Sequence, residues 1–285
     1  MVKFFKIVFD FIAHLGMKYS FLKRNFLWRH CSPQWRRIKL YVTTKVFYAT
    51  NTARINAIAD RLADEQSKDI YWGMIKFRQS LNKKDFPLCD CEEPPQYFIK
   101  EVKFREEGEV FIDCGAFDGD TLDEFLKRCP NYKHIIAFEP DTANFHVLCQ
   151  KHGGNSKITL IKAGVYNTDG EVFFIERADL SSAVSAKEAS DTVRIPVKSI
   201  DNLNVDNVSF IKMDIEGSEL NALKGAEKTI LRDKPKLAIC IYHSNEDMLC
   251  IPEYIYTLVP DYKFYVRQYG KYPYIYDTVL YALMP

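Results

Sequence analysis

Three acidic segments, each of which follows a short apolar run, carry the residue types from which a binding site could be built. The first comprises residues 113–121 and contains Gly115 and Gly119 among three aspartates. The second ends in Glu139, and the third, residues 212–216, alternates Lys, Asp and Glu at every second position. In open α/β sheets ligands bind beyond the carboxyl ends of the strands, so we expect these segments to meet at one site.

The first segment favours a positively charged ligand over a phosphate. Its glycines allow the backbone to turn sharply and approach a ligand, and the helix that follows offers free N–H groups. A dinucleotide-binding fold would require a third glycine in the pattern G-x-G-x-x-G, and the three acids would repel a pyrophosphate. S-adenosylmethionine carries an ammonium and a sulfonium group and fits this loop better. An ordinary tight turn between a strand and a helix is the structural alternative.

Glu139 lies where a carboxylate can bind a nucleoside. It ends an apolar run and follows Gly119 by 20 residues, the distance at which an acid accepts hydrogen bonds from ribose hydroxyls in nucleotide-binding folds. Asp141 follows at a position typical of a helix N-cap. We therefore give Glu139 a functional interpretation and Asp141 a structural one.

The third segment places charged side chains on one side of a strand end. Lys212, Asp214 and Glu216 alternate at period two within an apolar run. Buried charges need partners, so Lys212 would pair with an acid and leave Asp214 at the reacting centre. For Glu216 and Glu219 the structural interpretation is that they are favourable charges in the first turn of the next helix.

The apolar runs that precede these segments predict a mainly parallel sheet. Short runs alternate with helical patterns from about residue 105, which is typical of a doubly wound α/β fold covered on both faces. The predicted strands are 110–112, 134–138, 158–161, 172–175, 208–213 and 237–241. Two late aromatic strands, 263–267 and 278–283, have no long helix between them, so we expect an antiparallel pair at one edge of the sheet.

Charge divides the chain into two parts. The formal net charge is only +1, but residues 1–60 carry six Lys and five Arg against two Asp, a net +9 that leaves −8 for residues 61–285. A helical pattern extends to about residue 85, and a segment rich in prolines and acids ends it. We therefore predict two domains, a basic helical region over residues 1–95 and an α/β domain over residues 96–285.

The basic region has an apolar helical face, and two locations for it stay open. Residues 1–40 either rest on anionic lipid at the inner face of a membrane or pack on the body of the protein. No stretch approaches the roughly 18 uncharged apolar residues of a spanning helix, and no cleavage site follows the apolar start. The eight cysteines are spread along the chain, which is typical of reduced thiols. We expect a cytoplasmic protein that binds no nucleic acid.

Taken in order, the three acidic segments resemble the FkbM family of S-adenosylmethionine-dependent methyltransferases. The resemblance rests on residues 113–121, on Ala137-Phe138-Glu139-Pro140, and on residues 211–219 followed by Leu223-Lys224-Gly225-Ala226. Residues 96–98 and the pair Tyr242-His243 with Asp247 also match a common form of the family. The resemblance covers about residues 95–285 and implies a class I methyltransferase fold, which is Rossmann-like and has a seven-stranded sheet.

The resemblance also implies cofactor-binding residues and a reaction. The residues expected around S-adenosylmethionine are Asp113, Gly115 and Asp118 at the methionine part, Thr121 in the same segment, Glu139 at the ribose, Ala163 in the adenine-side turn, and Asp214 beside the transferred methyl group. Members of the family usually methylate oxygen. Their acceptors are often sugars of glycans, glycolipids or natural products.

Asp214 and His243 are the predicted catalytic residues. Methyl transfer to a hydroxyl is an in-line displacement, so the site must align the reacting atoms and accept the hydroxyl proton. His243 ends an apolar strand, and its ordinary pKa of about 6.5 suits a base at neutral pH. Asp214, His243 and Asp247 fall at the ends of adjacent strands and are a candidate ligand set for a divalent metal ion, although no fixed ligand spacing supports it.

Two other functions stay open from the sequence. A NAD-dependent oxidoreductase is disfavoured by the missing third glycine and by the acidic loop. A noncatalytic adaptor that only retains the fold is disfavoured by the intact Asp113, Glu139 and Asp214. We therefore predict an O-methyltransferase that acts on a sugar hydroxyl of a small-molecule, glycan or glycolipid acceptor. The sequence does not indicate the oligomeric state.

Overall fold

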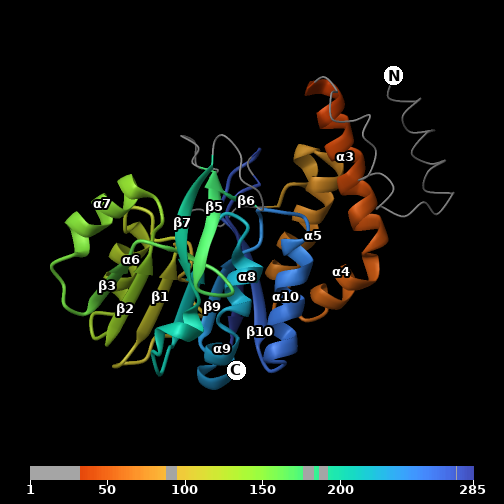
Figure 1. The fold of residues 1–285 in the computed structure, drawn as a ribbon. Helices are drawn as coiled ribbons and strands as arrows, with labels where there is room; N and C mark the ends of the chain where they lie inside the picture. Colours follow the sequence, from red (N-terminus) through yellow and green to blue (C-terminus); the bar gives the residue numbers. More distant parts are fainter. Residues whose placement is uncertain (1–32, 88–94, 176–182, 186–191, 274) are drawn as a thin grey trace, which may run out of the picture.

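A computed structural model of the protein describes most of the chain (Figure 1). The described residues are 33–87, 95–175, 183–185, 192–273 and 275–285. The first described element is helix α3 (Pro33–Thr50). Most of the predicted membrane-binding segment 1–40 therefore lies outside the described residues, and its association with lipid stays a prediction.

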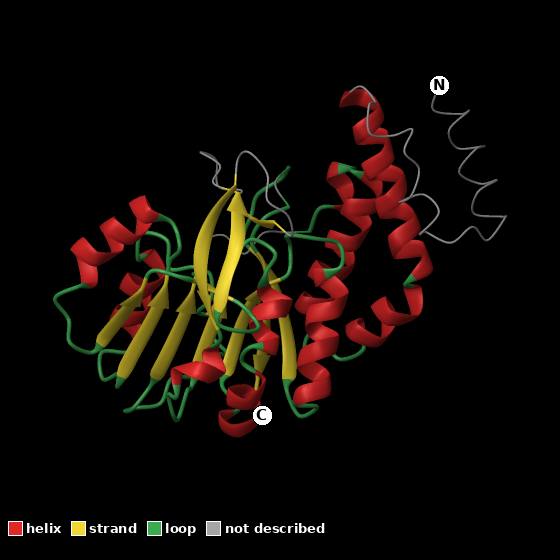
Figure 2. Ribbon diagram, in the orientation of Figure 1, coloured by secondary structure: helices red, strands yellow, loops and turns green. Residues whose placement is uncertain are grey.

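A seven-stranded sheet forms the centre of the protein, as predicted (Figures 1 and 2). Its strand order is β10-β11-β9-β8-β1-β2-β3. The strands are β1 (Val110–Cys114), β2 (His134–Phe138), β3 (Ile158–Ile161), β8 (Phe210–Met213), β9 (Lys236–Cys240), β10 (Lys263–Gln268) and β11 (Thr278–Leu283). Within this sheet, the five neighbouring strands β9, β8, β1, β2 and β3 pair in parallel. Strand β11 is antiparallel to both β9 and β10. The two late strands thus form the expected antiparallel pair at one edge.

Helices follow the parallel strands, and three of them begin near the positions predicted after the acidic segments, namely at Asp120, Thr142 and Glu219. The helices are α6 (Asp120–Arg128), α7 (Thr142–His152), α8 (Glu219–Lys224), α9 (Glu227–Asp233) and α10 (Asp247–Leu258). Asp141 is the N-cap of α7, and its side chain accepts hydrogen bonds from the N–H groups of Ala143 and Asn144. The structural interpretation of Asp141 is therefore confirmed.

A smaller four-stranded sheet, with the order β4-β7-β5-β6, accompanies the main one. Its strands are β4 (Gly164–Val165), β5 (Gly170–Ile175), β6 (Ala183–Ser185) and β7 (Thr192–Lys198). The predicted strand 172–175 belongs to this sheet, where β5 pairs antiparallel with β6 and β7. Only residues 162–169 separate β5 from β3 of the main sheet, too few for the crossover that a parallel neighbour of β3 would require. Figure 1 shows β5 and β7 in front of the main sheet and rising beyond its strands.

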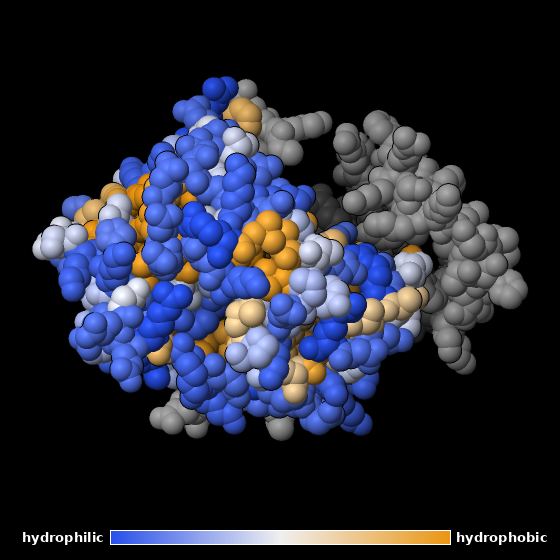
Figure 3. Space-filling view, turned by 90° about the horizontal axis from the view of Figure 1, so that it is seen from below, coloured by the Kyte–Doolittle hydropathy of each residue, from blue (hydrophilic) through white to orange (hydrophobic). Residues whose placement is uncertain are grey.

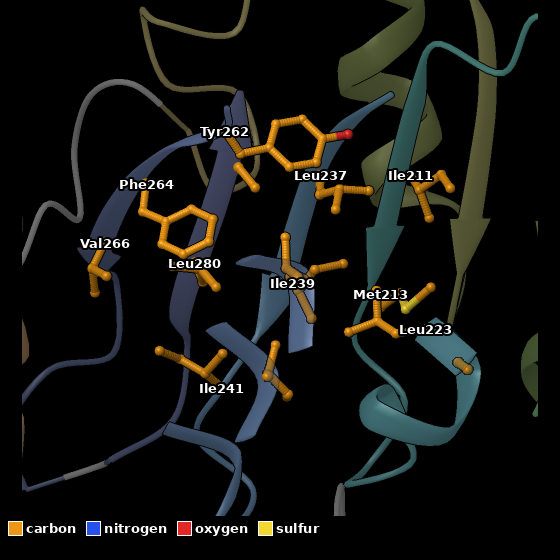
Figure 4. Packing of buried hydrophobic residues seen from close by; sticks show 14 of the residues in the cluster. Ile211, Met213, Leu223, Leu237, Ile239, Ile241, Tyr262, Phe264, Val266 and Leu280 are labelled. Carbon is orange, nitrogen blue, oxygen red and sulfur yellow. The ribbon is translucent and has the colours of Figure 1, made fainter. Parts of the chain in front are cut away.

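Successive side chains of each strand point to opposite faces of the sheet, so the core consists of two clusters, one on each face. Ile112 and Ile211 belong to the cluster that includes side chains of helices α8, α9 and α10, part of which Figure 4 shows. Phe111 and Phe210 belong to the other cluster, with side chains of α6 and α7. The ring of Phe111 stacks on those of Phe125 and Phe210, with centroids 4.6 and 4.9 Å apart. Both faces of the sheet are therefore covered, as the continuous apolar strands predict.

The described N-terminal helices form a layer beside α10 and the edge strand β10 (Figure 1). They are α3, α4 (Thr52–Ala59) and α5 (Glu65–Ser80). The buried hydroxyl of Tyr71 in α5 donates to the carbonyl of Met248 in α10 at 3.0 Å. Arg267 of β10 pairs with Asp64, the N-cap of α5, at 2.8 Å. The helices thus share one core with the sheet, and the domain boundary at residue 95 stays a prediction.

The surface is mainly hydrophilic on the face seen from below (Figure 3). Hydrophobic residues are grouped near the middle of that face. Exposed apolar side chains of this kind are normal on folded proteins. None of the described helices is long and apolar enough to cross a membrane.

The substitution Met74→Ala in α5 tests whether the helical layer is part of the cooperative core. Met74 is fully buried, and its truncation removes contacts and leaves a cavity. We expect the free energy of unfolding to fall by about 2–5 kcal/mol in a single transition, measured by urea unfolding with circular dichroism. The exposed Lys76 on the same helix provides the control Lys76→Ala, which should change stability by less than about 0.5 kcal/mol. A separate transition for the helices would contradict a shared core.

Candidate active site

The carboxyl ends of four neighbouring strands bring the predicted site residues together. In the order β9-β8-β1-β2, these strands are followed by His243, Asp214, Gly115 and Glu139 respectively. The N–H of Asp214 donates to the carbonyl of Cys114 at 3.1 Å, so β8 and β1 stay paired up to the loops. The three acidic segments therefore meet at one edge of the sheet, as expected from their positions after strands.

Gly115 allows the first loop to touch the end of β8. Its φ is +85°, a left-handed conformation that favours glycine. A Cβ atom at this position would lie 2.0 Å from the backbone oxygen of Asp214. The N–H of Gly115 also donates to the carbonyl of Phe138 at 3.0 Å, which joins the loop to the end of β2. Packing between three strand ends thus requires glycine here.

Asp113 and Lys212 form a buried ion pair beneath this loop. Their side chains are 0% and 3% exposed, with Nζ 3.0 Å from Oδ1, and Nζ also donates to the carbonyl of Gly115 at 2.6 Å. Burial raises the pKa of Asp113 to about 6, although Lys212 opposes the shift. Burial disfavours the charge on Lys212, but Asp113 and Asp214 outweigh it and raise its pKa. Asp113, expected at the methionine part of the cofactor, therefore supports the loop from below.

Glu139 holds the first loop and the start of α7 through its two oxygens. Oε2 accepts a hydrogen bond from the N–H of Phe117 at 2.8 Å, and Oε1 accepts one from the N–H of Asp141 at 2.9 Å. Burial raises the pKa of Glu139 to about 7, because the two N–H groups offset it only in part. Each carboxylate oxygen has a second lone pair, so Glu139 can still accept hydrogen bonds from a ligand.

The remaining predicted cofactor residues lie around the same loops in different surroundings. Asp118 is partly exposed and pairs with Lys151 of α7 at 2.8 Å, and this contact lowers the pKa of Asp118. Thr121 is buried in the first turn of α6, where its N–H donates to Oδ1 of Asp120 at 2.6 Å. Ala163 is buried directly after β3. The charge of Asp118 is thus turned toward α7.

Two tyrosine hydroxyl groups hold Asp214. Tyr97 donates to Oδ2 at 2.8 Å, and Tyr242 donates to Oδ1 at 3.0 Å. Gln96 donates in turn to the hydroxyl of Tyr97 at 2.9 Å. A carboxylate fixed on both oxygens is preorganised for a developing charge. Since its side chain is 22% exposed, Asp214 is also accessible to a ligand.

His243 lies between three carboxylates. Nδ1 is 3.1 Å from Oε1 of Glu219, and Nε2 is 3.5 Å from both Oδ1 of Asp214 and Oε2 of Glu216. Burial lowers the pKa of the imidazole, but the carboxylates, Glu219 foremost, outweigh burial and raise the pKa to about 9. The ordinary value of about 6.5 expected from the sequence is therefore wrong. His243 carries a proton at neutral pH and must lose it before it can accept another.

The N-terminal helices hold the loop that carries His243. Arg78 of α5 donates to the carbonyl of Tyr242 at 2.6 Å and to Oδ1 of Asn245 at 3.2 Å. Tyr48 of α3 donates to the same oxygen at 3.1 Å, and the amide of Asn245 donates to Oγ1 of Thr44 at 3.1 Å. Side chains on both sides of His243 are thus fixed from the helical layer.

Glu219 is a site residue that the sequence analysis missed. It lies in the first turn of α8, as expected, but its side chain is fully buried and faces His243. Among the described residues, Asp214, Glu219 and His243 each offer one ligand atom within 4.8 Å of the others. Asp247, predicted as a metal ligand, lies outside this group at the start of α10. No spacing in the sequence distinguishes Glu219 from the exposed acids that commonly begin helices.

A family model described as the methyltransferase FkbM domain matches residues 113–270, which is more than half of the chain. The chain belongs to the FkbM methyltransferase family. This result confirms the resemblance carried by the three acidic segments, all of which lie within the matched residues. A comparison with curated proteins gave no match.

A solved FkbM structure has the same fold. The crystal structure of the methyltransferase FkbM from Methylobacillus flagellatus is 29% identical over 86% of this chain, with a TM-score of 0.70. The present chain spans 62% of the length of that protein. An rRNA methylase from Streptococcus thermophilus is 16% identical over 62% of this chain and 87% of its own, with a TM-score of 0.41. The predicted class I methyltransferase fold is confirmed by the FkbM structure.

The substitution Gly115→Ala tests the close approach of strand ends in this FkbM protein. Its Cβ would clash with the backbone of Asp214, whereas Gly108 has a similar φ of +82° and no atom within 4 Å of the place that a Cβ would take. Gly108→Ala therefore introduces the same backbone strain without the clash. We expect Gly115→Ala to lose about 1–3 kcal/mol more stability than Gly108→Ala in urea unfolding. Equal losses would show that the contact with Asp214 imposes no constraint.

Proposed function

We propose that this protein transfers a methyl group from S-adenosylmethionine to a hydroxyl oxygen. The observation that supports this proposal is the excess of carboxylates at the carboxyl ends of the strands. Asp214, Glu216 and Glu219 surround one imidazole there, in a member of a methyltransferase family. A cofactor with a sulfonium and an ammonium group complements this charge, whereas a dinucleotide pyrophosphate would be repelled.

The proposed cofactor lies along the loops after β1, β2 and β3. Glu139 would accept hydrogen bonds from the ribose hydroxyls with the lone pairs that Phe117 and Asp141 leave free. The loop of Gly115, with Thr121, would face the methionine part, and Ala163 would face the adenine. Asp118 would contribute to the methionine part from the same loop only if it exchanges its contact with Lys151 for one with the cofactor. Asp113 would act indirectly, because its ion pair with Lys212 fixes that loop.

The proposed reaction breaks the bond between the methyl carbon and sulfur and forms one between that carbon and the acceptor oxygen. S-adenosylhomocysteine leaves, and the hydroxyl gives its proton to the deprotonated imidazole of His243. Asp214 is positioned to orient the acceptor hydroxyl, since Tyr97 and Tyr242 prevent its rotation. His243, predicted as the base, can serve only in its deprotonated form, and its carboxylate neighbours oppose that form.

For the acceptor we propose a sugar hydroxyl of a glycan, glycolipid or natural product. The rings of Tyr242 and His243 lie 4.0 Å apart, and the 54% exposed Tyr276 contacts Tyr242 edge to face. Aromatic side chains line most small-molecule sites, and an exposed ring beside the reacting groups fits the apolar face of a sugar.

We also propose that the reaction takes place in the cytoplasm, with the basic residues 1–40 at the inner face of a membrane. The described cysteines are free thiols, and three of the five are buried. The net charge of +9 over residues 1–60 supports attraction to anionic lipid.

Calorimetric titration with S-adenosylhomocysteine and, separately, with NAD tests the proposed function. We expect heat of binding with S-adenosylhomocysteine and none with NAD. Glu139→Gln should weaken the binding about tenfold, because a charged acceptor is lost at the ribose. The matched control is Glu107→Gln, at an exposed position before β1, which should bind as the wild type does. Binding of NAD alone would refute the methyltransferase proposal.

The pH dependence of this binding tests the role of Glu139 more closely. Its pKa is about 7, so acidification from pH 8 toward 6 protonates the carboxylate and removes acceptor capacity. Affinity for S-adenosylhomocysteine should therefore fall over that range in the wild type, and this step should be absent in Glu139→Gln. A lower step from Asp113, whose pKa is about 6, should remain in both proteins. The same pH profile in both proteins, measured by calorimetry, would exclude Glu139 from the ribose site.

A further inference from the structure

The group formed by Asp214, Glu219 and His243 contains buried polar atoms that methyl transfer alone does not explain. The side chain of Glu219 has no exposed surface, and its Oε2 makes no hydrogen bond. The side chain of His243 is 10% exposed, and neither ring nitrogen makes a hydrogen bond of suitable geometry. Buried polar groups without partners are rare and often mark the place of an ion or a water molecule.

The surroundings of this group carry excess negative charge. Glu216 adds a third carboxylate 3.5 Å from His243. Lys212 offsets this charge only in part, because its ammonium pairs with Asp113 at 3.0 Å. The pKa of Asp247 is raised by burial and, second, by the negative charge of Glu219. The pKa of Asp277 is raised by burial and, second, by the negative charge of Asp214. A bound cation would relieve this repulsion more fully than one proton on the imidazole does.

We propose that Asp214, Glu219 and His243 bind a divalent cation of the Mg²⁺ and Mn²⁺ class. One ligand atom from each residue lies within 4.8 Å of the other two. Ligands about 2.1 Å from a cation are about 3.0 Å apart at right angles and about 4.2 Å apart when opposite, which is similar to the separations within this set. Two carboxylates and one imidazole, with no thiolate, suit hard and borderline cations.

Neighbouring groups already hold two of the ligands in orientation, as is usual around metals. Tyr97 and Tyr242 fix Asp214, and the N–H of Ile215 donates to Oε1 of Glu219 at 2.8 Å. Oε2 of Glu219 is then the oxygen without a partner. The candidate set thus differs from the one predicted by sequence, since Glu219 takes the place of Asp247.

A cation here has a clear use, because a coordinated hydroxyl loses its proton more readily. It would replace the proton on His243, which would then serve as a neutral ligand instead of a base, and the proton of the coordinated hydroxyl would pass to water. This use rests on the proposed function, whereas binding of the cation does not. The test therefore measures binding.

Titration of the full chain with Mn²⁺, after removal of metals with a chelator, tests the inference. Calorimetry and the electron paramagnetic resonance signal of free Mn²⁺ should show one bound equivalent, with Mg²⁺ competing for it. Glu219→Gln should weaken Mn²⁺ binding by about tenfold or more. Glu107→Gln, at an exposed position before the amino end of β1, is the matched control and should bind Mn²⁺ as the wild type does. If Glu219→Gln does not fold, as judged by circular dichroism, His243→Gln replaces it with the same expectation.

Each outcome bears on one proposal. Absence of Mn²⁺ and Mg²⁺ binding by the wild type, or equal binding by the wild type and Glu219→Gln, overturns the cation site. In the same preparation, S-adenosylhomocysteine binding without Mn²⁺ binding leaves the proposed function intact and overturns only this inference. Mn²⁺ binding that Glu219→Gln weakens, without S-adenosylhomocysteine binding, supports the cation site and refutes the proposed function.

Discussion

The buried ion pair between Asp113 and Lys212 determines the geometry of the strand ends on which the site depends. These residues are direct partners in the register of β1 and β8, so their side chains meet across adjacent strands. Lys212 also binds the carbonyl of Gly115 and thereby fixes the turn that brings the first loop against Asp214. Removal of one partner from such a pair typically costs about 3–5 kcal/mol, because the other charge stays buried. The position of Asp214 thus depends on charges that never reach the surface.

Charge is distributed differently inside the sheet and beyond the ends of its strands. One buried acid is neutralised by a lysine within the sheet, whereas the acids beyond the strand ends share a single imidazole. That imbalance raises the pKa of His243 to about 9 and turns a residue expected to be a base into a cation. The net charge of +1 conceals this local excess, since the basic residues are concentrated near the N-terminus.

Sequence patterns predicted those features of the fold and the site that are determined by residues close together in the chain. The alternation of Lys212 and Asp214 within an apolar run predicted that Lys212 pairs with an acid, and its buried ion pair with Asp113 confirms this. The burial of Glu219 could not be predicted, because it arises when the loop after β9 places His243 over α8. Tyr97 appeared only within a family-like segment, and its contact with Asp214 joins residues 117 positions apart. The separate sheet of β5 depends likewise on pairing with distant strands.

Strand β11 follows every other described element in the sequence, yet it lies between β10 and β9 in the sheet. Until residues 278–283 are in place, β10 has no partner through which to join the sheet, and α5, which packs on β10, has no edge strand fixed beneath it. Because residues 278–283 are synthesised after β10 and after the helical layer, the sheet edge and that layer can reach their final arrangement only once this strand has been made. The assembly of both therefore depends on one late strand, even though the central strands are made much earlier.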